Sequence, residues 1–101
     1  MLTACLPFSE PLKTTGVWVI GFERNDFFEG PKPPPVQIMW EASTGAELVV
    51  DEKIYKWKPK PEIEALQVDL VGRRALCPVG AINPYPIAVE KLQIRRRLGS
   101  H

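Results

Sequence analysis

Aromatic and basic residues alternate along Tyr55-Lys56-Trp57-Lys58. Single-stranded nucleic acid is bound by aromatic rings that stack on bases, beside cations that follow the backbone. In an extended strand, however, Tyr55 and Trp57 share one face and the two lysines share the other. We therefore favour aromatic side chains that join the core and lysines that stay in solvent. The candidate ligand-binding residues are Tyr55, Trp57, Lys56, Lys58, Arg73 and Arg74.

The tetrapeptide Leu2-Thr3-Ala4-Cys5 resembles the lipobox of bacterial lipoproteins, with an apolar residue three places before a cysteine and two small residues between. The resemblance implies that Cys5 is lipidated and that residues 1–11 form a leader remnant or tether. Acyl chains would then anchor the protein without a membrane-spanning segment. Only Met1 precedes the motif, so the charged and apolar parts of a signal peptide are not seen. Three explanations stay open: a sequence trimmed just before the motif, a start codon further upstream, and a chance match in a cytoplasmic protein.

The two cysteines, Cys5 and Cys77, could pair in an oxidising compartment. A lipidated Cys5 would instead leave Cys77 single, and for Cys77 we favour the role of a small buried apolar residue. Two cysteines and one histidine cannot build a four-ligand zinc site without carboxylates at unrelated spacing, so we expect no metal.

The sequence offers little for catalysis. His101 ends a tail, residues 98–101, that we interpret as a purification-tag remnant. Without it no histidine remains to activate a serine or a cysteine, and no glycine-rich phosphate loop is present. Carboxylates are paired at Asp51-Glu52 and at Glu62 and Glu64, where they would point to opposite faces or suit a helix start. We therefore expect a protein that is not an enzyme and has no cofactor.

Phe27 and Phe28 lie in an acidic aromatic segment at 22–29. Two adjacent side chains cannot both point inward from one strand. One of the two is therefore a candidate contact for a protein partner. The alternative is that both are buried beneath the proline-rich connection at 30–35.

The 101 residues carry 13 Lys and Arg against 12 Asp and Glu, a net charge of +1, and 45% of them are apolar. These figures fit one soluble globular domain and argue against a disordered tail. The charge is divided, because residues 1–52 sum to −5 and residues 53–101 to +6. We expect acidic and basic strands to pair with each other. The alternative is a basic binding face, in which Arg95-Arg96-Arg97 extends a nucleic-acid track or faces anionic lipid headgroups.

Strands are predicted where β-branched and aromatic residues alternate or cluster: at 16–23, 36–41, 47–51 with a continuation through 54–57, 66–70 and 87–94. The first is apolar on both faces, so one face should meet the core and the other a second element, and Gly21 indicates a bend. Pro61 suits the first position of a helical turn at 61–66. The apolar phase changes within 87–94, which predicts a β-bulge near Glu90-Lys91.

Three strands, a helical turn and two more strands resemble the OB-fold, a small five-stranded Greek-key barrel, and small bacterial OB-like domains of uncharacterised type. The resemblance implies an all-β domain at 12–97 with one short helical turn between strands 3 and 4. We expect a non-enzymatic binding domain of a bacterial envelope lipoprotein, facing the periplasm, with a protein or a small molecule as its ligand. The alternative is a cytoplasmic OB-fold that binds single-stranded nucleic acid through residues 55–60 and Arg73-Arg74.

Overall fold

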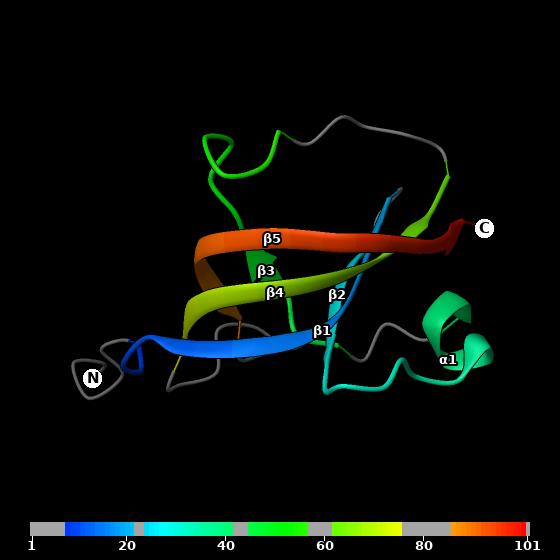
Figure 1. Cartoon of the computed structure of the whole chain (residues 1–101), viewed down its shortest axis with the longest axis horizontal. Helices are drawn as coiled ribbons and strands as arrows, with labels where there is room; N and C mark the ends of the chain where they lie inside the picture. Colours follow the sequence, from blue (N-terminus) through cyan, green and yellow to red (C-terminus); the bar gives the residue numbers. More distant parts are fainter. Residues whose placement is uncertain (1–7, 22–23, 42–44, 57–61, 76–85, 101) are drawn as a thin grey trace, which may run out of the picture.

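The structure is a computed structural model of the chain, and it describes residues 8–21, 24–41, 45–56, 62–75 and 86–100. Figure 1 shows three long strands side by side, with a short helix beyond one end of them. The elements are β1 (Leu12–Gly21), β2 (Arg24–Glu29), α1 (Val36–Glu41), β3 (Leu48–Val49), β4 (Glu64–Arg74) and β5 (Ile87–Ser100).

The strands form one five-stranded sheet in the order β2-β1-β4-β5-β3. The β1–β2, β1–β4 and β4–β5 pairs are antiparallel, and β3 runs parallel to β5. An antiparallel bridge between Phe27 of β2 and Ala46, two residues before β3, joins the two edges of the sheet. This connectivity confirms the expected all-β, five-stranded, OB-like barrel.

The sequence of β1 is apolar on both faces because both faces are covered. Trp18 and Ile20 point into the barrel interior with Phe27, Leu66 and other residues of one core cluster. Val17 and Val19 point outward, where Met39 of α1 joins them in a second cluster. The prediction that a second element covers the outer face of this strand is confirmed, and that element is α1.

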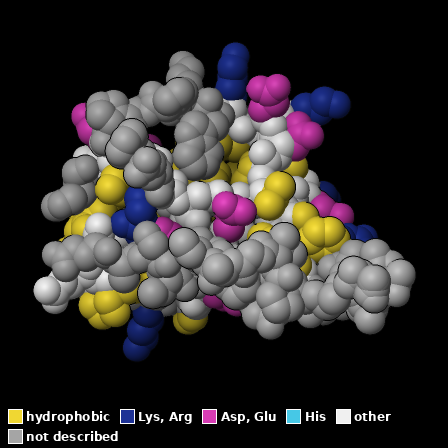
Figure 2. Space-filling model, turned by 180° about the vertical axis from the view of Figure 1, so that it is seen from behind, with side chains coloured by type: hydrophobic (Ala, Val, Ile, Leu, Met, Phe, Trp, Pro, Cys, Tyr) yellow, Lys and Arg dark blue, Asp and Glu magenta, His cyan; other side chains and the backbone are white. Residues whose placement is uncertain are grey.

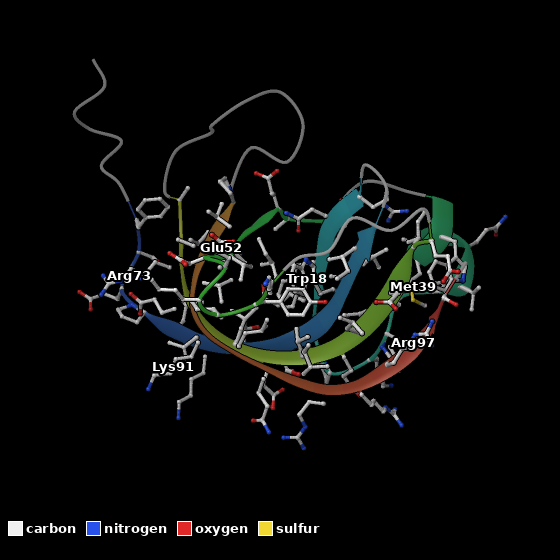
Figure 3. The ribbon with its side chains drawn as sticks, turned by 90° about the horizontal axis from the view of Figure 1, so that it is seen from above. Trp18, Met39, Glu52, Arg73, Lys91 and Arg97 are labelled. Carbon is white, nitrogen blue, oxygen red and sulfur yellow. The ribbon has the colours of Figure 1, made fainter. Side chains whose placement is uncertain are left out.

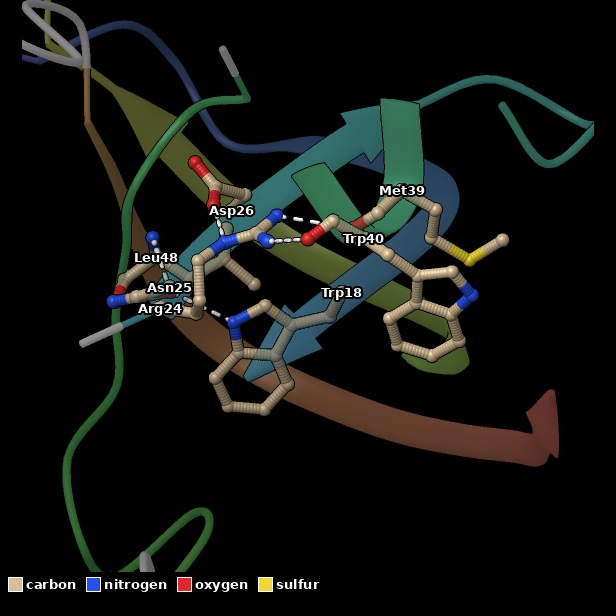
Figure 4. Close-up of polar contacts among 7 residues, drawn as sticks. All are labelled: Trp18, Arg24, Asn25, Asp26, Met39, Trp40 and Leu48. Atoms are coloured by element: carbon tan, nitrogen blue, oxygen red, sulfur yellow. Dashed lines mark hydrogen bonds and ion pairs between the residues drawn. The ribbon is translucent and has the colours of Figure 1, made fainter. Parts of the chain in front are cut away.

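The side chain of Asn25 closes the barrel where β2 meets β3. Its Nδ2 donates to the carbonyl of Leu48 at 2.8 Å, and its Oδ1 accepts from the Leu48 amide at 3.2 Å. The same Oδ1 accepts from the indole Nε1 of Trp18 at 2.8 Å, so one amide ties the central core residue to both edge strands (Figure 4). The Asn25 side chain thus takes the place of backbone hydrogen bonds between β2 and β3. These bonds are needed because β3 is only two residues long.

Arg24 fixes α1 against the outside of the sheet. Its Nε pairs with Asp26 Oδ2 at 2.6 Å, and both side chains are buried. Its Nη1 and Nη2 donate to the carbonyls of Trp40 and Met39 at 3.0 and 3.1 Å, as Figure 4 shows. A cation at the carboxyl end of a helix satisfies carbonyls that have no partner within the helix.

The expected β-bulge is confirmed in β5. Val71 pairs with Lys91 while Gly72 pairs with Val89, so Glu90 is the additional residue. Further shifts leave Arg95 and Leu98 outside the register. Bulges increase the local twist of a strand, which lets β5 follow the curved surface of the barrel over 14 residues.

Three predictions about local structure were wrong. The expected helical turn at 61–66 is not found in its described part, because Glu64, Ala65 and Leu66 begin β4 and pair with both β1 and β5. The expected strand at 36–41 is the helix α1, which follows three consecutive prolines. The acidic aromatic segment at 22–29, which we interpreted as a turn, forms β2 over residues 24–29. The short helix therefore lies between β2 and β3, whereas the expectation placed it between strands 3 and 4.

The continuation through 54–57 is also wrong in its described part, since residues 52–54 form a turn and 55–56 are irregular. The predicted bend at Gly21 is found at the end of β1, where φ is +153° and a side chain would collide with the Glu62 carbonyl oxygen.

The domain limits differ slightly from 12–97. Before β1, Phe8 bridges to Ala75, and Ser9 donates its amide to the Arg74 carbonyl at 2.8 Å. At the other end, β5 continues past residue 97 to Ser100, and Leu98 packs against the second core cluster. Residues 98–100 therefore belong to the sheet. In the described part of the chain, no helix has the length and apolar character needed to cross a membrane.

We predict that Asn25→Ala lowers the free energy of unfolding by about 3 kcal/mol, since it removes the partner of two buried backbone groups and one indole. Urea unfolding at neutral pH measures the change. Gln93→Ala on the exposed side of β5 is the control and should shift stability by less than about 0.5 kcal/mol. Equal effects of the two substitutions would contradict the closing role of Asn25.

Candidate functional site

The predicted aromatic and basic segment is described only at Tyr55 and Lys56, because Trp57 and Lys58 lie outside the described residues. The Tyr55 ring is half-buried and meets Trp18 edge to face, with 5.2 Å between ring centroids and 68° between planes. Lys56 is exposed. For these two residues the favoured interpretation is confirmed, since the aromatic side chain packs on the core and the lysine is in solvent.

Arg73 and Arg74 point to different surroundings. Arg73 Nε pairs with Glu90 Oε2 at 2.9 Å on the exposed side of β4 and β5. Arg74 Nη2 pairs with Glu29 Oε1 at 2.8 Å, and Thr14 donates its hydroxyl to the other carboxylate oxygen at 2.6 Å. The hydrogen bond from Thr14, with a smaller contribution from Arg74, lowers the pKa of Glu29.

Phe27 and Phe28 point to opposite faces of β2. Phe27 is only 2% exposed and lies in the barrel interior, so it cannot serve as an exposed contact. Phe28 is half-buried beside the second core cluster and lines an outer groove of about 510 Å³ with Pro34 and Ile38. Hydrophobic side chains reach the surface on the side of the molecule where α1 lies (Figure 2).

Cys5, Cys77 and His101 lie outside the described residues. Within the described ranges, no three His, Cys, Asp or Glu side chains are grouped so that they could hold a metal ion.

The structure brings together a surface that the sequence indicated only at Arg95-Arg96-Arg97, the outward side of β1, β4 and β5, which we call the convex face. The register places Lys13, Val71 and Lys91 in one row across the three strands. The next outward row is Thr15, Asp69 and Gln93. A groove of about 670 Å³ lies over these rows. In Figure 3 the Lys91 side chain projects outward into solvent on the convex side, while Trp18 lies on the concave side.

The three strands that form the convex face carry seven basic and three acidic residues, counted over both of their faces. By register, Glu64 and Arg97 lie on the inward side, with Ile20 and Leu66. Each carboxylate is paired with an arginine of the same strands: Glu90 with Arg73 at 2.9 Å, Asp69 with Arg95 at 3.1 Å and Glu64 with Arg97 at 3.5 Å.

Three cations remain without a carboxylate partner among the described residues. Lys13 and Lys91 flank the apolar side chain of Val71, and Arg96 donates to the neutral amide of Gln67 at 2.9 Å. Neighbouring strands are about 4.8 Å apart, so the backbones of β1 and β5 are separated by roughly 10 Å. Two long lysine side chains across that distance can reach the same anionic ligand.

The expectation that acidic and basic strands neutralise each other is met, within the described residues, at one ion pair between the two halves of the chain. Between described residues, Arg74 and Glu29 form the ion pair that joins the two halves, while the three pairs of β4 and β5 lie within the basic half. The basic excess therefore survives on one face.

Sequence reasoning missed Lys13 and Lys91, which lie near opposite ends of the chain. The available signal was their parity, because Lys13 alternates with Thr15 and Lys91 with Gln93 at strand spacing. The pairing of β1 and β5 through β4 was needed to place them in one row.

Comparison with known proteins gives no match to any family model, curated protein or solved structure.

We predict that Glu29→Gln lowers stability at neutral pH and that its effect shrinks in acid. Because the folded state lowers the pKa of Glu29, its ionised form stabilises the fold above the unfolded value of 4.5. That contribution is lost as the pH falls through the lower folded pKa. Urea unfolding at about pH 7 and about pH 3 measures it. Glu10→Gln, at an exposed site, is the control. A Glu29→Gln effect that is constant with pH would contradict the prediction.

Proposed function

We propose that this protein is a non-enzymatic binding domain whose convex face binds a ligand with anionic groups, a small molecule or an acidic protein segment. The observation that carries the proposal is the row Lys13, Val71 and Lys91, in which two lysines with no carboxylate partner in the described part of the chain flank an apolar residue. Polar groups of Thr15 and Gln93 lie in the adjacent row and can complete the contacts.

The physical basis is electrostatic. A cation that already has a carboxylate partner gives up that interaction when it binds a second anion, whereas Lys13 and Lys91 give up only water. Surface contacts of this kind are individually weak, from about 0.2 to 1 kcal/mol, and are screened by salt. Binding by several such contacts together therefore implies an affinity that falls with ionic strength.

We further propose that the domain belongs to a bacterial envelope lipoprotein facing the periplasm, with the cytoplasm as the alternative location. The resemblance at Leu2-Thr3-Ala4-Cys5 supports this. Phe8 and Ser9 are attached to the end of β4, so the lipobox cysteine is separated from the barrel by two residues. Cys5 precedes Phe8 by three positions in the sequence. The genomic sequence upstream of Met1 tests this part: a basic segment followed by an apolar one supports it, and a reading frame without them contradicts it.

We predict that inorganic pyrophosphate and a hexaglutamate peptide, titrated into ¹⁵N-labelled protein, shift the amide signals of β1, β4 and β5. Lys13→Gln with Lys91→Gln should weaken this binding by roughly fivefold to tenfold, as expected for two exposed charge contacts. The control is Lys53→Gln with Lys56→Gln, which removes the same charge from exposed lysines elsewhere. Shifts spread evenly over the surface, or equal loss in both variants, would contradict the proposal.

Single-stranded nucleic acid is the second candidate ligand, favoured by the cations Lys91, Arg95, Arg96 and Arg97 that follow one another along β5. The original hypothesis also needs Tyr55 as a stacking platform, and this ring is half-buried against Trp18.

Binding of a labelled oligothymidine at low salt, measured by fluorescence anisotropy, distinguishes the two candidate binding sites. If phosphates bind the convex face as simple anions, Lys13→Gln with Lys91→Gln weakens binding and Tyr55→Leu leaves it unchanged. Loss of binding in a folded Tyr55→Leu variant would instead favour the nucleic-acid site at residues 55–58.

A further inference from the structure

We infer that the anionic partner of the convex face is a lipid bilayer, and that the barrel docks side-on against phospholipid headgroups through Lys13, Lys91 and Arg96. This inference rests on the proposed anion-binding function and names the partner of the same surface. It adds a second membrane contact, independent of any acyl chain on Cys5.

The charge pattern of the face suits a surface of distributed negative charge. Every carboxylate of β4 and β5 is neutralised by an arginine, and the three remaining cations come from two strands and from two different rows of the sheet. Lys13 and Lys91 can share one anionic group, but Arg96 lies two outward rows further along the sheet. The three cations together therefore fit several headgroups better than one small ligand. Each such residue raises the affinity of the protein for a bilayer with anionic lipids by about fivefold at low salt.

The shape of the surface favours a bilayer over a nucleic acid strand. β1, β4 and β5 form a curved layer that is convex on the side from which Lys91 extends (Figure 3). Cations on a convex surface can contact the flat surface of a bilayer. Binding of a single strand needs exposed aromatic rings beside the cations. Within the described residues, no aromatic side chain lines the groove on the convex face, and Trp18 faces the interior of this layer.

Apolar side chains are exposed at one end of the same layer. The start of β1, the end of β4 and the start of β5 meet there because the strands are antiparallel, and they lie together at the left of Figure 1. Phe8 is 46% exposed at this end and gains by entering the boundary between headgroups and acyl chains. Leu12, which is 37% exposed, alternates with Lys13 along β1 and lies on the opposite side of the strand.

The N-terminal segment leaves the barrel at this end, since Phe8 is bridged to Ala75 just after β4. A lipid on Cys5 would hold this end of the convex face close to the bilayer, and the effective concentration of headgroups around Lys13 and Lys91 would be high. The two contacts would therefore reinforce each other, as an acyl chain and a basic patch do.

The test is co-sedimentation of the full chain, without lipid on Cys5, with vesicles of phosphatidylethanolamine and phosphatidylglycerol and with vesicles of phosphatidylcholine alone. We expect binding to the anionic vesicles, loss of that binding at high salt, and much weaker binding to the neutral ones. The triple variant Lys13→Gln, Lys91→Gln and Arg96→Gln should lose about 100-fold in affinity.

The matched control is Lys32→Gln, Lys53→Gln and Lys56→Gln, three exposed lysines outside the convex face. It changes the net charge from +1 by the same three units, so a purely non-specific attraction would weaken equally in both variants. Thermal unfolding of both variants verifies that they are folded. Phe8→Ser should weaken binding without changing its dependence on salt.

Equal losses in the two triple variants would overturn the inference. So would absence of vesicle binding while pyrophosphate still shifts the signals of β1, β4 and β5, and in that case the anion-binding function itself stands. If neither pyrophosphate nor vesicles bind, both proposals are wrong. An oligothymidine that displaces the protein from vesicles at equal phosphate concentration would favour nucleic acid over lipid as the partner.

Discussion

The rest of the structure depends on β1. The second half of this strand is apolar on both faces, so both of its faces must be covered there, whereas its first half is polar on the outward face. Trp18 and Ile20 fill the barrel, and Val17 and Val19 require a cover on the outside, which α1 supplies. Before them, the outward positions are Lys13 and Thr15, which need no cover. The change from polar to apolar along one strand therefore divides the outer surface into a part under α1 and an open, charged part.

Electrostatics then gives the open part its character. The net charge of +1 conceals a basic excess that the fold keeps on β1, β4 and β5. Arg24, buried with Asp26, has a structural role because it holds the carboxyl end of α1. The arginines of β4 and β5 other than Arg96 pair with nearby carboxylates. Lys13 and Lys91 remain available for a ligand, and for this reason we propose that the convex face is the binding surface.

Sequence reasoning reached the fold class and the β-bulge at Glu90, because the phase of apolar residues in a strand is visible without a structure. It failed at α1, where Val36, Met39 and Trp40 fit a helical spacing as well as a strand, and only the uncovered Val17 and Val19 decide between them. It failed at Glu64–Leu66 because pairing with two neighbouring strands outweighs a local preference for a helical turn. The sequence could not show that Lys13 and Lys91 lie in one row, since their proximity follows from strand register rather than from local sequence.

The most direct test of the central claim is paramagnetic relaxation enhancement from nitroxide-labelled headgroups in anionic nanodiscs, measured on the amide signals of the ¹⁵N-labelled protein. The account predicts that line broadening is confined to the outward residues of β1, β4 and β5 and is strongest at Lys13 and Lys91. Broadening centred on α1 or on the turn at 52–54 would contradict it, because the cations of the convex face would then point away from the bilayer.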